Sequence, residues 1–463
     1  MAIRYISTRG IAPTLSFREA VLAGLASDGG LYLPDSVPAF STAEMEALKN
    51  ASYADLAYAV ISRFIDEQSV APDVLKKIIH ESYATFRHPD VAPLKNIGDV
   101  HVLELFHGPT LAFKDFALQF LGRLLGHIFT TSNEHATVIG ATSGDTGSAA
   151  IAGFAGRPNM DIFIMHPKGR VSDVQRKQMT TIADANVHNI AVDGTFDDCQ
   201  DIVKALFNDV GFRSKHKLIA VNSINWARIL AQVVYYFYAA FKLGAPKQAV
   251  SFTVPTGNFG DIYAGYIAKR MGLPIEKLII ATNKNDILAR TLATGEYSMG
   301  GVCPTLSPSM DIQISSNFER LLFDLHGRDG AVIQQKMQQL RSAKKLTLSQ
   351  KAFAEFKKEF AAGSADDAAT LATIKDVYEK TGDLLDPHTA VGYAVALKQK
   401  IQTPMIVLAT AHPAKFPDAV KKATGIHPEL PAFLADLFSL PERSHPLPND
   451  KKAVESFIES HTK

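Results

Sequence analysis

The sequence predicts an α/β protein with mostly parallel sheets flanked by helices, preceded by a mostly helical N-terminal domain. From about Val100, short β-branched runs alternate with helical patterns, as in "ATVIG" before "SAAIAGFAG" and "AVSFTVP" before "IYAGYIAKRMG". This alternation is typical of parallel strands covered by helices. The first 95 or so residues instead contain a Gly/Pro turn region, "SDGGLYLPDSVP", and helical patterns. A chain of 463 residues is also too long for one ordinary core, which predicts two or three domains.

The elements can be placed in order along the chain. Ser41, followed three residues later by Glu44, predicts a capping box at the start of a helix. Residues 330–385 are mostly helical and charged in pattern, and the tail "SLPERSHPLPND" is a Pro-rich surface segment before a short final helix. We expect an N-terminal domain at 1–95, a smaller α/β domain at 96–215 and a larger α/β domain at 216–463.

Composition excludes several classes of protein. Lys plus Arg is 48 and Asp plus Glu is 47, giving a net charge of +1, which does not favour nucleic-acid binding. The two cysteines, Cys199 and Cys303, provide neither a disulfide framework nor metal-ligand spacing. The first residues have no apolar secretory core, and no apolar stretch is long enough to span a bilayer. We therefore expect a cytoplasmic protein with no metal, no nucleic-acid partner and no membrane association.

A lysine lies in an otherwise apolar stretch, "HGPTLAFKDFALQF". If residues 111–127 are helical, Lys114 shares a face with leucines rather than with the polar stripe of Asp115, Gln119 and Arg123. One interpretation is that its stem runs along the surface and its ammonium reaches solvent. The other is chemical: apolar surroundings lower the pKa of an ammonium, and a neutral amine can form an imine with a carbonyl. Pyridoxal phosphate is the commonest cofactor held in this way.

Such a cofactor also needs an anion site, and two glycine-rich loops qualify. "GATSGDTGS" (140–148) and "PTGNFGD" (255–261) each follow a strand-like run and open a helix, where backbone N–H groups converge. Neither is a P-loop or a dinucleotide motif, which disfavours ATP and NAD. Taken alone, each loop also fits a tight turn with an Asp or Thr cap.

The two loops differ in the groups they offer. Gly257 and Gly260 allow close backbone approach and Asn258 adds an amide, so the second loop better suits a phosphate monoester. The charge of Asp261 would repel that phosphate, which favours a helix-cap role for it. The first loop could hold a substrate carboxylate through the hydroxyls of Thr142, Ser143 and Thr146.

Five segments together resemble the threonine synthases: "HGPTLAFKDFALQF", "GATSGDTGSAA", "VPTGNFGDIYAGY", "DPHTAVGYA" and "TAHPAKF". These are pyridoxal-phosphate enzymes of the tryptophan synthase β-subunit-like family, fold type II. "GLASDGGLYLP" is also typical of them, so the resemblance runs from about residue 5 to about residue 425. It implies two open, mostly parallel sheets, and the branch with the longer N-terminal domain, which acts without S-adenosylmethionine activation.

The resemblance assigns roles to individual residues. Lys114 matches the Schiff-base lysine, and Thr410 the residue that hydrogen-bonds the pyridine nitrogen of the cofactor. The cofactor-phosphate loop is matched by Gly257, Asn258, Phe259 and Asp261. The segment that holds the substrate α-carboxylate is matched by Thr142, Ser143, Asp145 and Thr146.

Other candidates come from residue type alone. Arg228 could bind the substrate phosphate because its fork suits an oxyanion, although a surface arginine is the plainer interpretation. Asp386 and Pro387 predict a helix start, and His388 in that first turn could face either the site or solvent. His107 and His412 lie beside motifs, but a lone histidine is more often structural.

The implied activity is that of a phosphate-eliminating lyase. Its substrate would be O-phospho-L-homoserine, converted to L-threonine by γ-elimination of phosphate and addition of water at Cβ, with Lys114 removing the Cα proton. Two alternatives stay open: a threonine or serine dehydratase of the same fold, and a non-catalytic relative that binds a phosphorylated ligand. We expect a monomer or a dimer.

Overall fold

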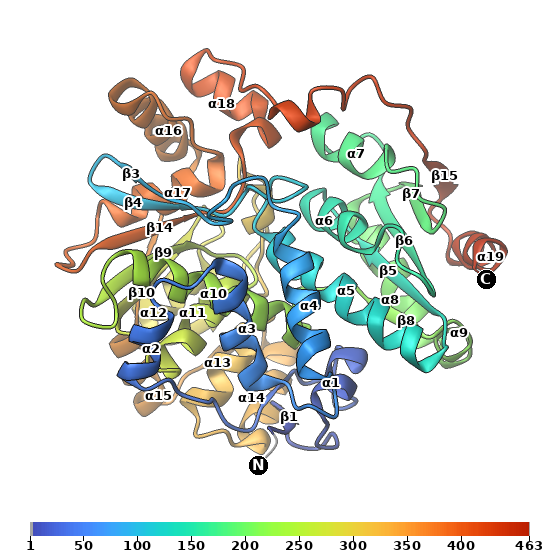
Figure 1. Cartoon of the computed structure of the whole chain (residues 1–463), viewed down its shortest axis with the longest axis horizontal. Helices are drawn as coiled ribbons and strands as arrows, with labels where there is room; N and C mark the ends of the chain where they lie inside the picture. Colours follow the sequence, from blue (N-terminus) through green and yellow to red (C-terminus); the bar gives the residue numbers. More distant parts are fainter. Residues whose placement is uncertain (1–2, 463) are drawn as a thin grey trace. The chain divides into compact units, whose positions relative to one another are not determined.

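The computed structural model describes residues 3–462, which divide into two compact units that interleave along the chain (Figure 1). Unit 1 comprises the chain up to His80, His88–His107 and Ser223–Pro428. Unit 2 comprises Glu81–Arg87, Gly108–Asn222 and the described chain from Glu429 onward. The three-domain division expected from the sequence follows other boundaries and stays a prediction.

The N-terminal part is mostly helical, as predicted. A short antiparallel pair, β1 (Tyr5–Ser7) and β2 (Tyr32–Pro34), accompanies the helices. These are α1 (Phe17–Ala23), α2 (Thr42–Leu48), α3 (Tyr53–Ile61) and α4 (Pro72–Tyr83). The capping box at Ser41 and Glu44 is confirmed, since the serine side chain accepts from the Glu44 N–H and the glutamate returns a bond to the cap.

Unit 1 contains a six-stranded sheet in the order β13-β10-β9-β14-β4-β3. Its strands are β3 (Leu94–Ile97), β4 (Val100–Glu104), β9 (Val250–Pro255), β10 (Ile275–Thr282), β13 (Phe360–Ser364) and β14 (Met405–Ala409). All neighbours are parallel except β3 and β4. The mostly parallel sheet expected from the sequence is therefore confirmed in this unit.

Helices cover both faces of this sheet. On one face, α16 (Asp367–Thr381) and α17 (Pro387–Ala396) bury apolar side chains against β3, β4, β9, β10 and β14. On the other, α10 (Trp226–Lys242) and α11 (Gly260–Arg270) pack on each other and on the sheet (Figure 1). Gly265 allows this approach, because a Cβ there would lie 2.6 Å from the Tyr236 ring. The carboxyl end of β9 leads into the loop before α11, and the carboxyl end of β14 leads into the loop that follows Ala409.

The rest of unit 1 is mostly helical, as predicted for residues 330–385. The helices are α12 (Ile287–Thr294), α13 (Phe318–Leu325), α14 (Gly330–Ala343), α15 (Gln350–Glu359) and α18 (Pro417–Thr424). A short antiparallel pair, β11 (Glu296–Ser298) and β12 (Lys345–Thr347), lies between them in the sequence.

Unit 2 contains a five-stranded, all-parallel sheet in the order β15-β7-β6-β5-β8. Its strands are β5 (Ala136–Ala141), β6 (Met160–Pro167), β7 (Val187–Asp193), β8 (Leu218–Ala220) and β15 (His445–Pro448). Its helices are α5 (Lys114–Ser132), α6 (Asp145–Phe154), α7 (Asp173–Thr180), α8 (Phe196–Asn208), α9 (Val210–His216) and α19 (Lys451–His461). One face packs against α8, α9 and α19, and α6, which lies against α5, contacts β6.

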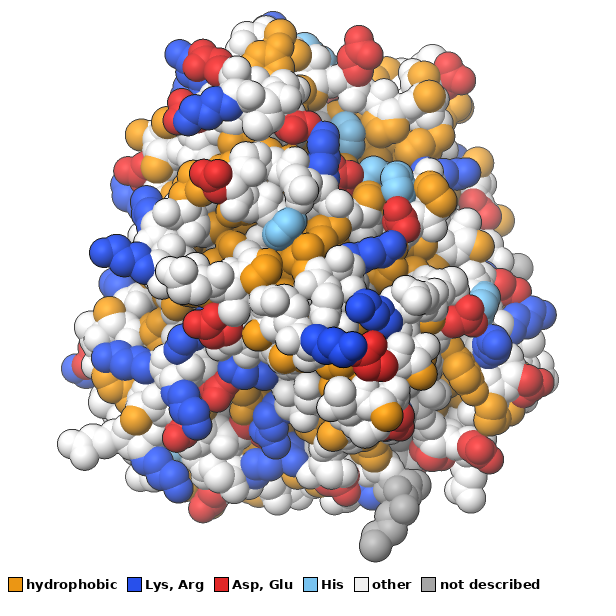
Figure 2. All heavy atoms as spheres, turned by 60° about the vertical axis from the view of Figure 1, so that its left-hand side comes forward, with side chains coloured by type: hydrophobic (Ala, Val, Ile, Leu, Met, Phe, Trp, Pro, Cys, Tyr) orange, Lys and Arg blue, Asp and Glu red, His pale blue; other side chains and the backbone are white. Residues whose placement is uncertain are grey.

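The C-terminal tail contains a strand that the sequence did not predict. The final helix is confirmed as α19, but the Pro-rich segment before it also contributes β15, which pairs with β7 at the edge of the unit 2 sheet. Within residues 3–462, no helix is both long and apolar enough to cross a bilayer. Figure 2 shows basic and acidic side chains interspersed over the visible face, in keeping with the near-zero net charge.

Candidate functional site

Lys114 is buried in unit 2 at the first residue of α5. Only 8% of it is exposed, so the interpretation in which the side chain reaches solvent is wrong. The helix begins three residues later than expected, at Lys114 rather than Leu111, and ends at Ser132. The supposed polar stripe is also wrong in part, because Asp115 and Gln119 are fully buried.

Asp115 instead shapes the turn that leads into α5. Its carboxylate accepts hydrogen bonds from the backbone N–H of Thr110 at 2.8 Å and from the Thr110 hydroxyl at 2.7 Å. Gly108 packs so closely on Asp115 that a Cβ there would lie 2.5 Å from its Oδ2. This turn fixes where α5 begins and therefore where the Lys114 side chain starts.

The surroundings of Lys114 are not purely apolar, which corrects the sequence expectation. Its Nζ lies 3.2 Å from Oδ2 of Asp145, a residue only 5% exposed. The resemblance placed Asp145 in the segment that holds the substrate α-carboxylate. A buried carboxylate at this distance stabilises the ammonium form of the lysine. The pair therefore has the geometry of a proton-accepting amine with its counter-ion.

Gln175 holds the second oxygen of that carboxylate. Its Nε2 donates to Oδ1 of Asp145 at 2.8 Å, and its Oε1 accepts from the Ser172 hydroxyl at 3.0 Å. Gly144, at φ 143°, leaves the space that Gln175 occupies, since a Cβ there would lie 2.4 Å from the amide carbon. Sequence reasoning missed Gln175, because it lies 30 residues from its partner in an ordinary polar helix.

The 140–148 loop of unit 2 is closed largely by its own Thr142. The threonine Oγ1 accepts from the N–H groups of Gly144 at 2.9 Å and Gly147 at 2.8 Å. Among residues 3–462, the hydroxyls of Ser143 and Thr146 form no hydrogen bond, and Ser143 is exposed. Of the three expected hydroxyls, these two are therefore available to a ligand, and Thr142 is mainly structural.

In the 255–261 loop of unit 1, residues outside the loop hold its carbonyls, and its own side chains do not occupy its N–H groups. Its carbonyls are held from outside: the Ser315 hydroxyl donates to Gly257 O at 2.6 Å, and Asn317 donates to Asn258 O from its backbone at 3.1 Å. Phe259 takes a left-handed conformation, φ 64°, and no side chain caps the start of α11. The first N–H groups of this helix are therefore left for an anion. Sequence reasoning missed both Ser315 and Asn317.

Asp261 does not cap this helix, so the expected role is wrong. Its carboxylate accepts from the hydroxyls of Tyr235 at 2.6 Å and Tyr236 at 2.9 Å, tying α11 to α10. Burial, and then the charge of Asp261, raise the pKa of both tyrosines well above its ordinary value. Both phenols therefore stay protonated and keep donating to Asp261 through the neutral pH range.

A buried histidine supports the segment behind Gly257. Asp386 caps α17 as predicted. His388 Nδ1 donates to Asp386 Oδ1 at 2.8 Å, and its Nε2 accepts from the Ser309 N–H at 3.3 Å. A Cβ at position 257 would lie 2.8 Å from Ser309 O. His388 thus fixes the backbone against which the glycine packs, and it does not face solvent.

Thr410 follows β14, the neighbour of β9. Carboxyl ends of parallel strands lie at one edge of a sheet, so Thr410 and the 257–261 loop share that edge. The residue is 6% exposed, and within residues 3–462 its hydroxyl forms no hydrogen bond.

His412, two residues later, is a structural residue. Burial lowers its pKa to about 4, so the ring is neutral, and its Nδ1 accepts a hydrogen bond from the Ala414 N–H at 3.1 Å.

Arg228 is buried, so the surface-arginine interpretation is wrong. In the described part of the chain its Nε and Nη1 have no hydrogen-bond partner, and burial lowers its pKa to about 10. A guanidinium buried without an anion is costly. Asn317 connects the segment before α10 to the 255–261 loop, since its Nδ2 donates to Ser223 O at 3.1 Å and to Asn258 O at 3.2 Å. Arg228 is therefore suited to an anion bound near this end of α10.

Sequence comparison defines the class of protein first. A family model described as "Pyridoxal-phosphate dependent enzyme" matches residues 87–409, so the chain is a pyridoxal-phosphate-dependent enzyme. Models described as "Threonine synthase N terminus" and "Threonine synthase, C-terminal" match residues 4–83 and 389–458. The chain belongs to the threonine synthase family.

Individual relatives agree over nearly the full length. A threonine synthase of Pseudomonas aeruginosa is 54% identical, covering 99% of this chain and 98% of the relative. A human protein, threonine synthase-like 2, is 38% identical over 94% of this chain and 91% of the relative. A crystal structure of pyridoxal-phosphate-bound threonine synthase from Brucella melitensis has a TM-score of 0.98 at 55% identity, covering both chains completely. The fold type and the cofactor expected from the sequence are confirmed.

Proposed function

We propose that this enzyme converts O-phospho-L-homoserine and water to L-threonine and phosphate. The observation that carries the proposal is the buried Lys114 amine, 3.2 Å from the Asp145 carboxylate, in a chain of this family. A lysine placed in this way can bind a cofactor aldehyde and exchange protons with a substrate. One water is consumed and one phosphate released, so the overall reaction needs no oxidant or reductant.

The described residues fit the cofactor. Lys114 would bind it covalently, and the backbone N–H groups of the 257–261 loop, which leads into the uncapped start of α11, would receive its phosphate. The Thr410 hydroxyl bonds the pyridine nitrogen as a neutral partner, which leaves the ring less electron-withdrawing than a carboxylate would. When bound, the cofactor supplies an electron sink for the Cα carbanion.

Lys114 moves the protons. Its Nζ takes the Cα proton, and the ammonium so formed is stabilised by Asp145. Gln175 keeps the Asp145 carboxylate oriented by holding its other oxygen. A Cβ proton is then lost as phosphate leaves Cγ, and the same amine can return a proton at Cγ. Water then adds at Cβ, and a proton returns to Cα.

The substrate is held by its two anionic ends. Ser143 and Thr146 donate to the α-carboxylate, with Thr142 shaping the loop. Arg228 binds the substrate phosphate, which would supply the partner that its Nε and Nη1 lack. The assignment of Asp145 to the carboxylate is replaced by its role beside Lys114.

Broader properties of the protein are also proposals. We place it in the cytoplasm, which suits the free thiols of Cys199 and Cys303. We expect it to work as a monomer or a dimer, with functional domains divided near residues 95 and 215.

The test is a product assay on the cofactor-loaded enzyme. Phosphate and L-threonine should appear in equal amounts from O-phospho-L-homoserine, with little ketoacid from L-threonine or L-serine. Ketoacid as the main product would indicate a dehydratase instead. Borohydride treatment followed by peptide mapping should place the cofactor on Lys114, and labelling there without any product would indicate a non-catalytic phospholigand-binding relative.

A further inference from the structure

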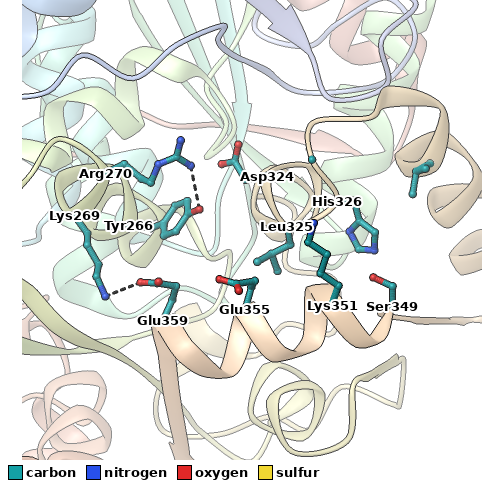
Figure 3. A pocket seen from close by; sticks show the side chains of 12 residues that line it. Tyr266, Lys269, Arg270, Asp324, Leu325, His326, Ser349, Lys351, Glu355 and Glu359 are labelled. Atoms are coloured by element: carbon teal, nitrogen blue, oxygen red, sulfur yellow. Dashed lines mark hydrogen bonds and ion pairs between the residues drawn. The ribbon is translucent and has the colours of Figure 1, made fainter.

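A second cavity lies in unit 1 at the far end of α11 (Figure 3). Its volume is about 700 Å³, within the range of small-molecule pockets. The 11 residues of α11 separate it from the 257–261 loop by roughly 16 Å at 1.5 Å per residue. The cavity is therefore distinct from the candidate cofactor site, and binding of a ligand in it is independent of the proposed function.

Three helices supply the polar wall. The last turn of α11 contributes Lys269 and Arg270, the end of α13 contributes Asp324, and α15 contributes Lys351, Glu355 and Glu359. Figure 3 shows α15 running beneath the cavity, with Lys351 and Glu355 projecting from it toward the other two helices.

Some of these charges are already neutralised by neighbours. Lys269 and Glu359 form an ion pair at 2.6 Å. Asp324 accepts from the Tyr263 hydroxyl at 3.0 Å and lies 3.2 Å from Nε of Arg328. These groups are satisfied within the protein and do not need a ligand.

Three charges remain weakly matched. Arg270 forms one hydrogen bond, with the Tyr266 hydroxyl at 3.2 Å, and it shares the attraction of the Asp324 carboxylate with Arg328. Among residues 3–462, Lys351 has no ion pair. Glu355 has only Lys358, at 3.7 Å, with half of the Glu355 side chain exposed, a geometry that contributes little. The cavity therefore offers two cations and one carboxylate.

Their order along the cavity is fixed by α15. Lys351 and Glu355 are four residues apart and so share one face of the helix. The Lys269–Glu359 pair places the end of α11, with Arg270, beside the last turn of α15. In Figure 3, Glu355 lies on α15 between Glu359 and Lys351, and Arg270 lies across the cavity from α15, beside Asp324.

We propose that this cavity binds a small α-amino acid that carries a second anionic group. Arg270 and Lys351 hold the two anionic ends, and Glu355 holds the ammonium. The ligand has a net charge of −1, which balances the one cation left in excess when Glu359 is paired with Lys269 and Asp324 with Arg328, a residue outside the cavity lining. The start of α15, capped by Ser349, adds a favourable dipole beside Lys351.

Other ligand classes match the wall less well. An apolar molecule would desolvate three charges without replacing their hydration. A dianion with no amine would leave the Glu355 carboxylate facing like charge. A simple zwitterion would leave one of the two cations without a partner.

The probe is L-glutamate, titrated into the cofactor-loaded enzyme by calorimetry beside glutarate, which has the same length but no amine. We expect saturable one-to-one binding of L-glutamate and binding of glutarate that is about tenfold weaker. Arg270→Ala and Lys351→Ala should each weaken L-glutamate binding about tenfold. Glu355→Ala should remove the preference for L-glutamate over glutarate.

Lys357→Ala is the matched control, because Lys357 lies on the same helix but packs over Phe353 outside the cavity. This variant should bind L-glutamate like the parent. The Lys351→Ala enzyme should also keep its kcat and KM, which shows that the fold is intact.

A parallel titration with O-phospho-L-serine separates two sources of the second anion. Tighter binding than L-glutamate identifies a phosphorylated amino acid, and weaker binding identifies a dicarboxylic one. O-Phospho-L-serine can also enter the candidate active site, so only binding that Arg270→Ala and Lys351→Ala weaken counts for the cavity. Absence of saturable binding of both probes, or binding unchanged in both variants, overturns the proposal.

Discussion

The two glycine-rich loops occupy equivalent places in their sheets, each between a parallel strand and the helix that comes after it. In the 140–148 loop, the Thr142 hydroxyl occupies the N–H groups of Gly144 and Gly147. In the 255–261 loop, neighbouring side chains hold the carbonyls, and the start of α11 is uncapped. The first loop is therefore closed by its own residues and acts through side chains, whereas the second presents its backbone to an anion.

Removing the amine beside the first loop should have the largest effect. Lys114→Ala should lower phosphate release from O-phospho-L-homoserine by about 10³-fold or more and abolish the visible absorption of the bound cofactor. Lys168→Ala, at an exposed lysine of the same unit, is the matched control. Normal turnover in the Lys114 variant would refute the assignment.

Removing the charge of Asp145 should have the second-largest effect on turnover. Asp145→Asn removes the counter-ion of the Lys114 ammonium while keeping the size of the side chain, and kcat should fall about 10²-fold. Asp173→Asn, at an exposed aspartate of unit 2, should leave kcat unchanged. Steady-state kinetics with an unaltered kcat in Asp145→Asn would mean that this carboxylate only fills space.

The backbone role of the second loop can be tested at Gly257. A Cβ there would lie 2.8 Å from the Ser309 carbonyl, so Gly257→Ala should displace the loop and weaken cofactor binding about tenfold. Gly301→Ala is the control, because nothing lies within 4 Å of the added carbon. Equilibrium dialysis measures the cofactor affinity, and equal values for the two variants would contradict the open-backbone description.

The self-closure of the first loop predicts an effect on stability. Thr142→Val leaves two backbone N–H groups without their acceptor and should lower the free energy of unfolding by about 2 kcal/mol. Ser143→Ala, one residue away at an exposed position, should change it by less than about 0.5 kcal/mol. Denaturant unfolding measures both, and equal stability of the two variants would show that Thr142 does not close the loop.

A smaller effect concerns pH. Burial lowers the pKa of His188 in unit 2 to about 4, from 6.5. The unfolded chain therefore binds a proton at this histidine below about pH 6.5, whereas the folded chain binds it only near pH 4. The contribution of His188 to the free energy of unfolding is thus fully present above about pH 6.5 and is lost as the pH falls. Between about pH 6.5 and 5 the loss from this group should be on the order of 1 kcal/mol. In denaturant unfolding across this range, His188→Gln should flatten that fall, and His427→Gln, at an exposed position, should not.

Much of the fold could be predicted from the sequence because its signals are local. The alternation of β-branched runs with helical patterns predicted both parallel sheets, and Ser41 and Asp386 were recognised as caps from their immediate neighbours. Lys114 stood out because a cation interrupts an apolar run. The boundaries of the compact units could not be predicted, since they depend on contacts between segments far apart in the chain.

The errors at the candidate site share one physical cause. Asp145, Asp261 and Arg228 were assigned from residue type, but their roles depend on partners 25 to 31 residues away or on burial. Gln175 and Asn317 were missed for the same reason, since nothing near them in the sequence marks their partners. One signal was available for Arg228: the helix that carries it is apolar on nearly every side, which indicates burial all round.

The last strand of the unit 2 sheet, β15, has a consequence for biosynthesis. Its partner β7 ends at Asp193, whereas β15 begins at His445, so 251 residues must be translated between them. At about 5–20 residues per second, a ribosome needs roughly 10 to 50 s for that stretch. During this interval the nascent chain carries β7 with an open edge, the kind of surface that recruits chaperones or promotes self-association.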